Sequence, residues 1–215
     1  MIVEIASMDL RVGDILYLEE DDENPDSSKD FGKNVLPAML NAGERMFAYR
    51  FDGYWKDVGT ISSLWEANME VLDPKNSGID LFDEDWKIYS RNSGMTGHKI
   101  GSDAVIKNSM ITDGCRIDGE VEHSVLFAGV KVAPGAVVKD AVVMGGTVIK
   151  PGAVVEHCII GENAVIGENA KIGVEKEGED KGVATIGPGV YVGDGATVGS
   201  NAMVRENVKD GEEEW

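Results

Sequence analysis

The chain has 215 residues, of which 42% are hydrophobic and 27% are charged, so a wholly disordered chain is excluded. Its formal net charge of −19 repels nucleic acid and anionic membrane surfaces, and we expect neither as a partner. Cys115 and Cys158 lie in apolar surroundings, which predicts buried free thiols. No apolar run reaches the length of a membrane span and no secretory signal pattern opens the chain, so we expect a cytoplasmic protein.

The first helix expected in chain order lies after a polar loop. Residues 3–20 mix strand-like and apolar residues, and residues 21–30 are rich in turn formers. Residues 31–44 carry an apolar helical face that Gly43 ends, formed by Val35, Leu36, Met39 and Leu40.

A second helix is expected over residues 60–72, after residues 45–59, whose alternation predicts a strand or hairpin. Either Thr60 or Ser63 has the spacing to cap this helix. Its inward face consists of Ile61, Leu64, Trp65, Met69 and Leu72. Two helices and a few strands bury little apolar surface by themselves, so we expect the chain to begin inside a larger domain.

Residues 74–99 connect this first part to the remainder of the chain. They contain four large apolar residues, Leu81, Phe82, Trp86 and Ile88. This is too many for a free linker, so we expect the segment to dock on one of the two domains.

The second half carries a six-residue repeat of aliphatic residues. Twelve residues follow this step, with one interruption: Val130, Ala136, Val142, Val148, Val154, Ile160, Ile166, Ile172, Ile186, Val192, Val198 and Val204. Small residues mostly stand two positions earlier, and Ile100 and Ile106 share the step upstream.

A period of six predicts a left-handed parallel β-helix, in which three hexads form one triangular coil of roughly 18 residues. The aliphatic side chains are expected to point into the prism, and glycines to form the corners. A β-sandwich would need alternation and hairpin turns instead, which the sequence lacks.

Two irregular stretches complete the second half. Residues 173–185 are charged and interrupt the step, so we expect a loop that bulges from one corner. Residues 209–215 are expected to form an acidic tail that closes the end of the coil or meets a partner. The resulting organisation is 1–73, 74–99, 100–208 and 209–215.

Four stretches in order resemble bacterial glucose-1-phosphate adenylyltransferase, also called ADP-glucose pyrophosphorylase. They are "SSKDFGKNVLP", "GYWKDVGTI", "LWEANMEVLDP" and "WKIYSRN", and the β-helix pattern follows them. The resemblance implies the C-terminal part of a Rossmann-like nucleotidyltransferase domain followed by a β-helix domain. It also implies synthesis of ADP-glucose and pyrophosphate from ATP and glucose 1-phosphate, for glycogen synthesis, with Mg²⁺.

The same resemblance implies roles for four residues. Asp30, Phe31 and Trp55 would contact glucose 1-phosphate, and Asp57 would bind the catalytic metal. A carboxylate is a hard oxygen ligand that suits Mg²⁺. From the residues alone, Asp30 is also a helix N-cap, Trp55 a core aromatic and Asp57 a turn aspartate before a helix.

The family's glycine-rich nucleotide loop, its other metal aspartate and its phosphate-binding lysine are absent from these 215 residues. Because phosphoryl-type transfer needs several charged groups at once, no complete catalytic set is present, and we expect this chain alone to be inactive. The β-helix is expected to support a homo-oligomer, or a hetero-oligomer with a related subunit, and allosteric control. Effector anions are expected near Lys33, Arg45 or Arg50.

Two other functions remain open. A hexapeptide-repeat acyltransferase would use a coil-borne histidine as base, His123 or His157. A non-catalytic regulatory or assembly subunit of the same pathway tends to lose the metal aspartate and the "KDVGT" stretch, which this chain keeps. His98, His123 and His157 have no carboxylate or cysteine at metal-ligand spacing, so we expect no metal site there.

Overall fold

Residues 12–89, 93–176 and 181–215 are described by the computed structural model of the chain. The chain divides into two compact units, Met1–Gly53 and Tyr54–Trp215. The second unit therefore contains the helix over residues 61–70 together with the β-helix. None of the described helices is long and apolar enough to cross a membrane.

The described secondary structure of the first unit is helical. It contains α1 (Val12–Glu23), a π-helix η2 (Phe31–Val35) and α2 (Leu36–Asn41). Val35 is buried, and Gly43 takes a φ of 78° just beyond the end of α2, so the helix expected over residues 31–44 is confirmed. In place of the mixed pattern expected over residues 3–20, the described residues from Val12 onward form α1; residues 3–11 lie outside the described part.

The loop between α1 and η2 is held by Lys29. Its Nζ donates hydrogen bonds to the backbone oxygens of Asp21, Asp22 and Asn24, at 2.6 Å for Asp21 and 3.0 Å for Asn24. The last carbonyls of a helix have no partner within the helix, so a lysine there satisfies them and offsets the negative end of the helix dipole.

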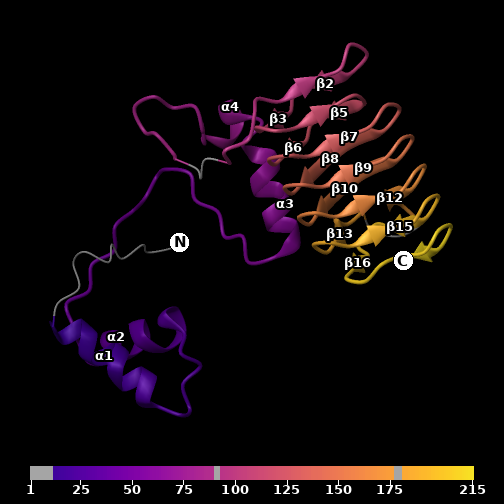
Figure 1. Cartoon of the computed structure of the whole chain (residues 1–215). Helices are drawn as coiled ribbons and strands as arrows, with labels where there is room; N and C mark the ends of the chain where they lie inside the picture. The colour runs from indigo at the N-terminus through magenta and orange to yellow at the C-terminus, as the bar shows by residue number, and fades with distance from the viewer. Residues whose placement is uncertain (1–11, 90–92, 177–180) are drawn as a thin grey trace. The chain divides into compact units, whose positions relative to one another are not determined.

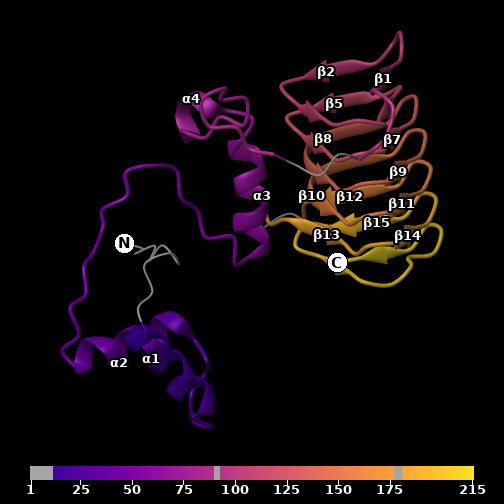
Figure 2. The same cartoon turned by 60° about the vertical axis from the view of Figure 1, so that its left-hand side comes forward.

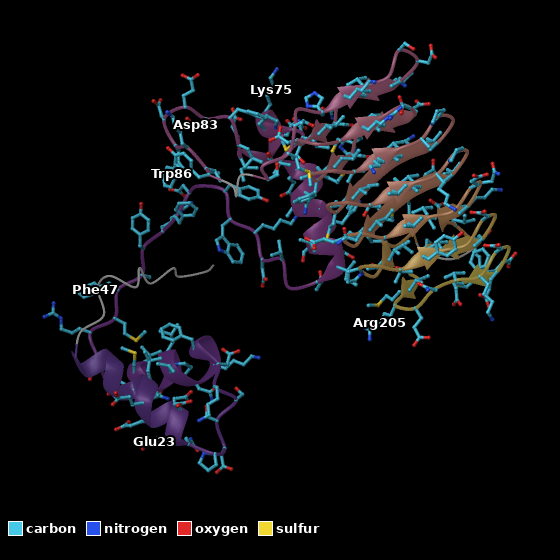
Figure 3. All side chains as sticks on the ribbon, viewed as in Figure 1. Glu23, Phe47, Lys75, Asp83, Trp86 and Arg205 are labelled. Carbon is cyan, nitrogen blue, oxygen red and sulfur yellow. The ribbon has the colours of Figure 1, made fainter. Side chains whose placement is uncertain are left out.

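The strand or hairpin expected over residues 45–59 is not formed, because no described strand lies in this stretch. Phe47 and Tyr49 are 79% and 75% exposed. Figure 3 labels Phe47 on this stretch. A strand is stable only when its backbone groups pair with a neighbour, and the described residues offer none here.

The second unit contains α3 (Ile61–Glu70), the short α4 (Pro74–Ser77) and every strand of the described residues (Figure 1). The strands are β1 (Lys99–Ile100), β2 (Val105–Lys107), β3 (Met110–Ile111), β4 (Arg116–Ile117), β5 (Glu120–Glu122), β6 (Val125–Leu126), β7 (Lys131–Val132), β8 (Val137–Val143), β9 (Val148–Ile149), β10 (Val154–Ile160), β11 (Val165–Ile166), β12 (Lys171–Val174), β13 (Ala184–Ile186), β14 (Tyr191–Val192), β15 (Thr197–Gly199), β16 (Met203–Val204) and β17 (Glu213–Glu214).

All these strands pair in parallel, and the left-handed parallel β-helix predicted from the repeat is confirmed (Figures 1 and 2). Pairing stacks the inward residues into three columns, one for each side of the prism. The columns are Ile100–Ile117–Val132–Ile149–Ile166–Val192–Val208, Ile106–Val121–Val138–Val155–Ile172–Val198, and Ile111–Leu126–Val143–Ile160–Ile186–Val204.

The register of the repeat differs from the predicted one in the middle coils. In these coils, Val137 pairs with Val154 on the next coil. One of the three sides of each coil therefore has five residues in place of six. The predicted inward residues Val148 and Val154 are consequently half-buried on the outside, whereas their neighbours Ile149 and Val155 are fully buried. Residues that the step of six predicts to point inward do lie in these columns at Ile100 and Ile106, and again from Ile160 onward.

In four successive coils, one corner of the β-helix is made without glycine. Asn108, His123, Asp140 and His157 stack there, each with a positive φ, between 38° and 49°. Asn, Asp and His tolerate this left-handed region better than other residues with a side chain. At this corner β8 and β10 bend without interruption, which is why each spans seven residues.

The irregular stretches both join the coil. Cys158 pairs with Ala141 on the preceding coil and with Ala184 on the following one, and the second step along the sequence is the longer of the two. The interruption between β12 and β13 is therefore an insertion of the expected kind; residues 177–180 within it lie outside the described part. Strand β17 of the tail pairs with β15, and the Trp215 ring lies over Gly199, where an added Cβ would be 2.4 Å from it.

The two cysteines lie inside the β-helix. Cys115 and Cys158 are buried free thiols, as predicted. Burial raises the pKa of both thiols, so they remain protonated and act as small core residues.

Helix α3 packs along one flat side of the β-helix (Figure 2). Met69 is buried against Val125, Val142 and Ile159, and the five residues of the predicted inward face all take part in this cluster. By contrast, Phe82, Trp86 and Ile88 of the connecting segment are 78%, 77% and 53% exposed, so the described contacts do not bury these three side chains as expected. Figure 3 labels Trp86 on this segment.

Candidate functional site

Asp30 and Phe31, the expected sugar contacts, lie at the start of η2 in the first unit. Asp30 is the N-cap of η2, and its Oδ1 accepts a hydrogen bond from the backbone N–H of Lys33 at 2.8 Å. That hydrogen bond and the nearby Lys33 ammonium, at 3.5 Å, lower the pKa of Asp30, so this carboxylate is ionised at neutral pH. Phe31 is 41% exposed beside it.

Trp55 and Asp57 lie on a non-helical stretch at the start of the second unit. Along Tyr54–Asp57 burial alternates: Tyr54 and Lys56 are partly buried, whereas Trp55 and Asp57 are exposed. An extended backbone sends successive side chains to opposite sides, which accounts for this alternation. The two expected site residues therefore share the open side of the stretch, and Trp55 is 49% exposed there.

Asp57 is a turn aspartate and does not cap α3. Its Oδ1 accepts a hydrogen bond from the backbone N–H of Gly59 at 3.0 Å. The N-cap of α3 is Thr60, which forms a reciprocal capping box with Ser63. Gly59 permits the close approach, since an added Cβ would be 3.2 Å from Oδ1. The turn thus fixes the direction of the Asp57 carboxylate.

The other side of the stretch is bound to α3 by charged groups. Lys56 Nζ lies 2.8 Å from Glu66 Oε2 and 2.7 Å from Glu70 Oε1. Tyr54 donates its hydroxyl proton to Glu70 Oε2 at 2.7 Å. The hydrogen bonds to Glu66 and then Glu70 raise the pKa of Lys56, and those from Lys56 and Tyr54 lower the pKa of Glu70. Burial, followed by Glu70, raises the pKa of Tyr54 to about 12.

Helix α3 is itself fixed on the β-helix by Trp65. The indole Nε1–H donates to the backbone oxygen of Asp140 at 2.7 Å, and the indole meets the His157 ring edge-on, with centroids 4.3 Å apart. Burial, and then the nearby Lys181, lower the pKa of His157. The corner that needs residues with positive φ is therefore the corner on which α3 is anchored.

His123 has a carboxylate partner, Asp140, that the six-residue step does not predict. Its Nδ1 lies 2.7 Å from Asp140 Oδ1, since both residues occupy the same corner on successive coils. The sequence shows no carboxylate at metal-ligand spacing from these histidines; Asp140, 17 positions away, reaches His123 because the pairing of successive coils brings distant positions together. The constant six-residue step hid this pairing.

Each residue expected near an effector anion contacts a neighbouring side chain in the first unit. Lys33 lies 3.5 Å from Asp30, Arg50 Nε lies 3.1 Å from Asp52, and the Arg45 guanidinium stands 5.7 Å above the Phe47 ring. These contacts are exposed and weak, so they leave the three side chains accessible to a competing anion.

The described residues do not by themselves make a magnesium site. No group of three or more His, Cys, Asp or Glu side chains comes together in the described ranges. Asp57 can supply one oxygen ligand on an exposed surface, whereas Mg²⁺ prefers six oxygens, several of them from water and substrate phosphates. Asp30 and Phe31 belong to one unit and Trp55 and Asp57 to the other, so the four residues are described as two pairs.

Comparison with known proteins gives a match for each half of the chain. Residues 13–74 match the nucleotidyl transferase family, and residues 94–193 match the family described as GlmU-like, C-terminal hexapeptide. The chain is 56% identical over 128 residues to a glucose-1-phosphate adenylyltransferase of Clostridium perfringens (strain SM101 / Type A), covering 60% of this chain and 33% of that protein.

Two further relatives carry the same name. That of Bacillus anthracis is 53% identical over 128 residues, which cover 60% of this chain and 34% of the relative. That of Clostridium botulinum (strain Alaska E43 / Type E3) is 51% identical over 126 residues, covering 59% and 32%. The chain is similar to glucose-1-phosphate adenylyltransferases. It spans about a third of the length of these curated relatives, and the resemblance drawn from the four sequence stretches is confirmed.

Proposed function

We propose that the protein containing this sequence synthesises ADP-glucose and pyrophosphate from ATP and glucose 1-phosphate. The observation that carries the proposal is the identity of 51–56% to proteins named glucose-1-phosphate adenylyltransferase. This chain would supply the C-terminal part of the nucleotidyltransferase domain, residues 1–73, a connection over residues 74–99, a β-helix domain over residues 100–208 and an acidic tail. Glycogen synthesis is the pathway that this product would serve.

In the proposed reaction, a phosphate oxygen of glucose 1-phosphate attacks the α-phosphorus of ATP, and the bond to the β-phosphate oxygen breaks to release pyrophosphate. Asp30 would accept a hydrogen bond from a sugar hydroxyl, which suits its ionised state. The exposed rings of Phe31 and Trp55 would pack against the C–H surface of the sugar. These contacts would orient the attacking phosphate.

Asp57 is proposed to bind Mg²⁺ in the complete site. The ion, when bound, would offset the charge of the phosphate oxygens during displacement. Asp57 fits this role because the Gly59 turn holds its carboxylate on the exposed side of the stretch. Because the described residues provide one such ligand, the remaining ligands would come from substrate phosphates, water and other residues of the whole enzyme.

The test is an assay of ADP-glucose formation by the whole protein that contains this sequence. Asp57→Asn is expected to lower kcat/KM by on the order of 100-fold, as expected when one stabilising group is lost from a transition state. Asp83→Asn, on an exposed turn of the connecting segment, is the matched control and should leave the rate unchanged. Absence of ADP-glucose synthesis in the unaltered protein would refute the proposal.

Retention of Asp57 and of the "KDVGT" stretch favours a catalytic over a regulatory subunit. An acyltransferase is not proposed, although His123 has a carboxylate partner, because about 60% of the chain is similar to proteins named adenylyltransferase. Loss of acyl-coenzyme A turnover in His123→Ala or His157→Ala would be needed to revive it.

We further propose a cytoplasmic homo-oligomer, or a hetero-oligomer with a related subunit, assembled through the β-helix and controlled by a metabolite anion. Its supporting observation is the open first coil, where Ile100 and Ile106 are 40% and 36% exposed although their columns are otherwise buried. Light scattering at micromolar concentration tests the assembly, and a monomer would contradict it.

A further inference from the structure

The stretch Tyr54–Asp57 has one side for α3 and one side for solvent. Lys56 keeps 20% of its side chain exposed, which is low for a lysine beside a surface helix. Trp55 and Asp57 project to the other side. The direction of the two expected site residues is therefore set by whatever holds Tyr54 and Lys56 in place.

Three hydrogen bonds hold them. Lys56 donates to Glu66 and Glu70, which stand one turn apart on α3, and Tyr54 donates to the second oxygen of Glu70. Both carboxylate oxygens of Glu70 thus have a donor from the same stretch. A network with partly buried charges holds its geometry better than a single exposed ion pair, because the second bond fixes side chains that the first has already ordered.

In the sequence, each of the two glutamates comes directly after a residue that anchors α3. Glu66 comes after Trp65, which binds the backbone of Asp140, and Glu70 comes after Met69, which is buried against the β-helix. The helix therefore turns its anchors toward the β-helix and its carboxylates toward the stretch. A continuous set of contacts runs from the β-helix corner through α3 to Lys56 and Tyr54.

We propose that Tyr54, Lys56 and Glu70 are positioning residues that clamp the Tyr54–Asp57 stretch to α3 and so direct Trp55 and Asp57 into the reaction site. This inference rests on the proposed adenylyltransferase function for the meaning of the site. The clamp itself stands on the described contacts. The raised pKa of Lys56 and the lowered pKa of Glu70 agree with a charged pair that persists at neutral pH.

Lys107 provides a matched control. Its Nζ also bridges two carboxylates, Glu120 at 3.5 Å and Glu122 at 3.6 Å, but on the outside of the β-helix and at 58% exposure. Lys56→Met and Lys107→Met remove the same charge and the same number of ion pairs. If the two variants differ in their effects, the difference arises from the place of Lys56 beside the Tyr54–Asp57 stretch and not from the loss of a lysine as such.

The first experiment needs no activity. In the 215-residue chain labelled with ¹⁵N, the indole N–H signal of Trp55 is assigned by its loss in Trp55→Phe and followed by relaxation measurements. We expect Lys56→Met and Tyr54→Phe to shift the Trp55 signal and increase its fast motion, whereas Lys107→Met leaves it unchanged. The Trp65 signal should stay, because Asp140 holds that indole.

Two outcomes would overturn the clamp. An unchanged Trp55 signal in both variants would show that nothing in the network fixes the stretch. A simultaneous change of the Trp65 signal would show that Lys56 acts on the docking of α3 as a whole. Lys56→Arg, which keeps a charged donor, should restore the Trp55 signal.

The second experiment uses the whole protein. Lys56→Met is expected to raise the KM for glucose 1-phosphate and the Mg²⁺ concentration that gives half-maximal activity. We expect kcat/KM to fall by at least about tenfold, because misplacing site groups by about 1 Å can lower the rate by about 100-fold. In Lys56→Met, the KM for ATP should stay within about twofold of the value for the unaltered protein. Lys56→Arg should recover most of the lost kcat/KM. Lys107→Met should have the kinetics of the unaltered protein. Equal kinetics for Lys56→Met and Lys107→Met would refute the clamp. If the unaltered protein makes no ADP-glucose, the proposed function fails, and the Trp55 signal still decides the clamp.

Discussion

The indole N–H of Trp65 donates a hydrogen bond to the backbone oxygen of Asp140 at 2.7 Å, across 75 positions of sequence. Asp140 takes a φ of 49°, so the corner of the β-helix turns this carbonyl toward α3. One hydrogen bond thus joins the β-helix to the helix that carries the proposed clamp.

Trp65→Phe tests how much this bond contributes. The variant keeps an aromatic ring but leaves the Asp140 carbonyl without its donor, and we expect the free energy of unfolding to fall by about 1–2 kcal/mol. Denaturant unfolding measures it. Trp86→Phe, at a side chain 77% exposed, is the control and should change stability by less than about 0.5 kcal/mol. Equal effects would show that the hydrogen bond contributes nothing.

The β-helix was predictable because its columns need aliphatic residues at regular intervals, and no helix or hairpin explains such a period. The exact register was not predictable from a constant step of six. The middle coils, in which Val137 pairs with Val154, each contain one shortened side, and each such side shifts the inward position by one residue. In a strand, a shift of one residue exchanges the inside for the outside.

Adjacent valines test this register. Val155→Ala removes two methyl groups from the fully buried column and should lower the free energy of unfolding by about 2–3 kcal/mol. Val154→Ala removes the same groups from a half-buried outward position and should cost less than about 1 kcal/mol. Thermal and denaturant unfolding compare the two. The reverse order would support the constant step of six.

Two glycines with positive φ allow the cost of backbone strain to be measured apart from the cost of steric overlap. Gly173 (φ 83°) lies where the register between β12 and β15 shifts, and an added Cβ would be 1.9 Å from the Glu156 carbonyl oxygen. We expect Gly173→Ala to cost about 3 kcal/mol or more. Gly189→Ala (φ 68°), where the added Cβ would meet nothing within 4 Å, should cost about 1–2 kcal/mol. Comparable losses in unfolding experiments would contradict the overlap at Gly173.

The site was predictable in part. Sequence alone offered Asp57 as a turn aspartate, and the Gly59 contact agrees with that assignment; its metal role stays a proposal. The clamp was not foreseen, because Lys56 lies 10 and 14 positions from its carboxylates and their meeting depends on how the stretch folds back along α3. The His123–Asp140 pair was hidden by the same kind of dependence, here on coil length.

His157 makes the packing of α3 sensitive to pH. Burial and Lys181 lower its pKa in the folded chain, while Asp140 and Glu175 oppose this, and the ring faces Trp65. The unfolded chain therefore binds more protons below the ordinary pKa of 6.5, so stability present above pH 6.5 is lost as the pH falls through the folded value. The slope for one group cannot exceed about 1.4 kcal/mol per pH unit.

His157→Asn removes the titration while retaining a residue that tolerates the φ of 44°. We expect unfolding experiments between pH 7.5 and 5.5, a range of about two units around the ordinary histidine value, to show a loss of stability in the unaltered chain and a flatter profile in the variant. His98→Asn, at an exposed position, should keep the unaltered profile. If His157→Asn and the unaltered chain lose stability in parallel, another group is responsible and the coupling between His157 and the Trp65 anchor is refuted.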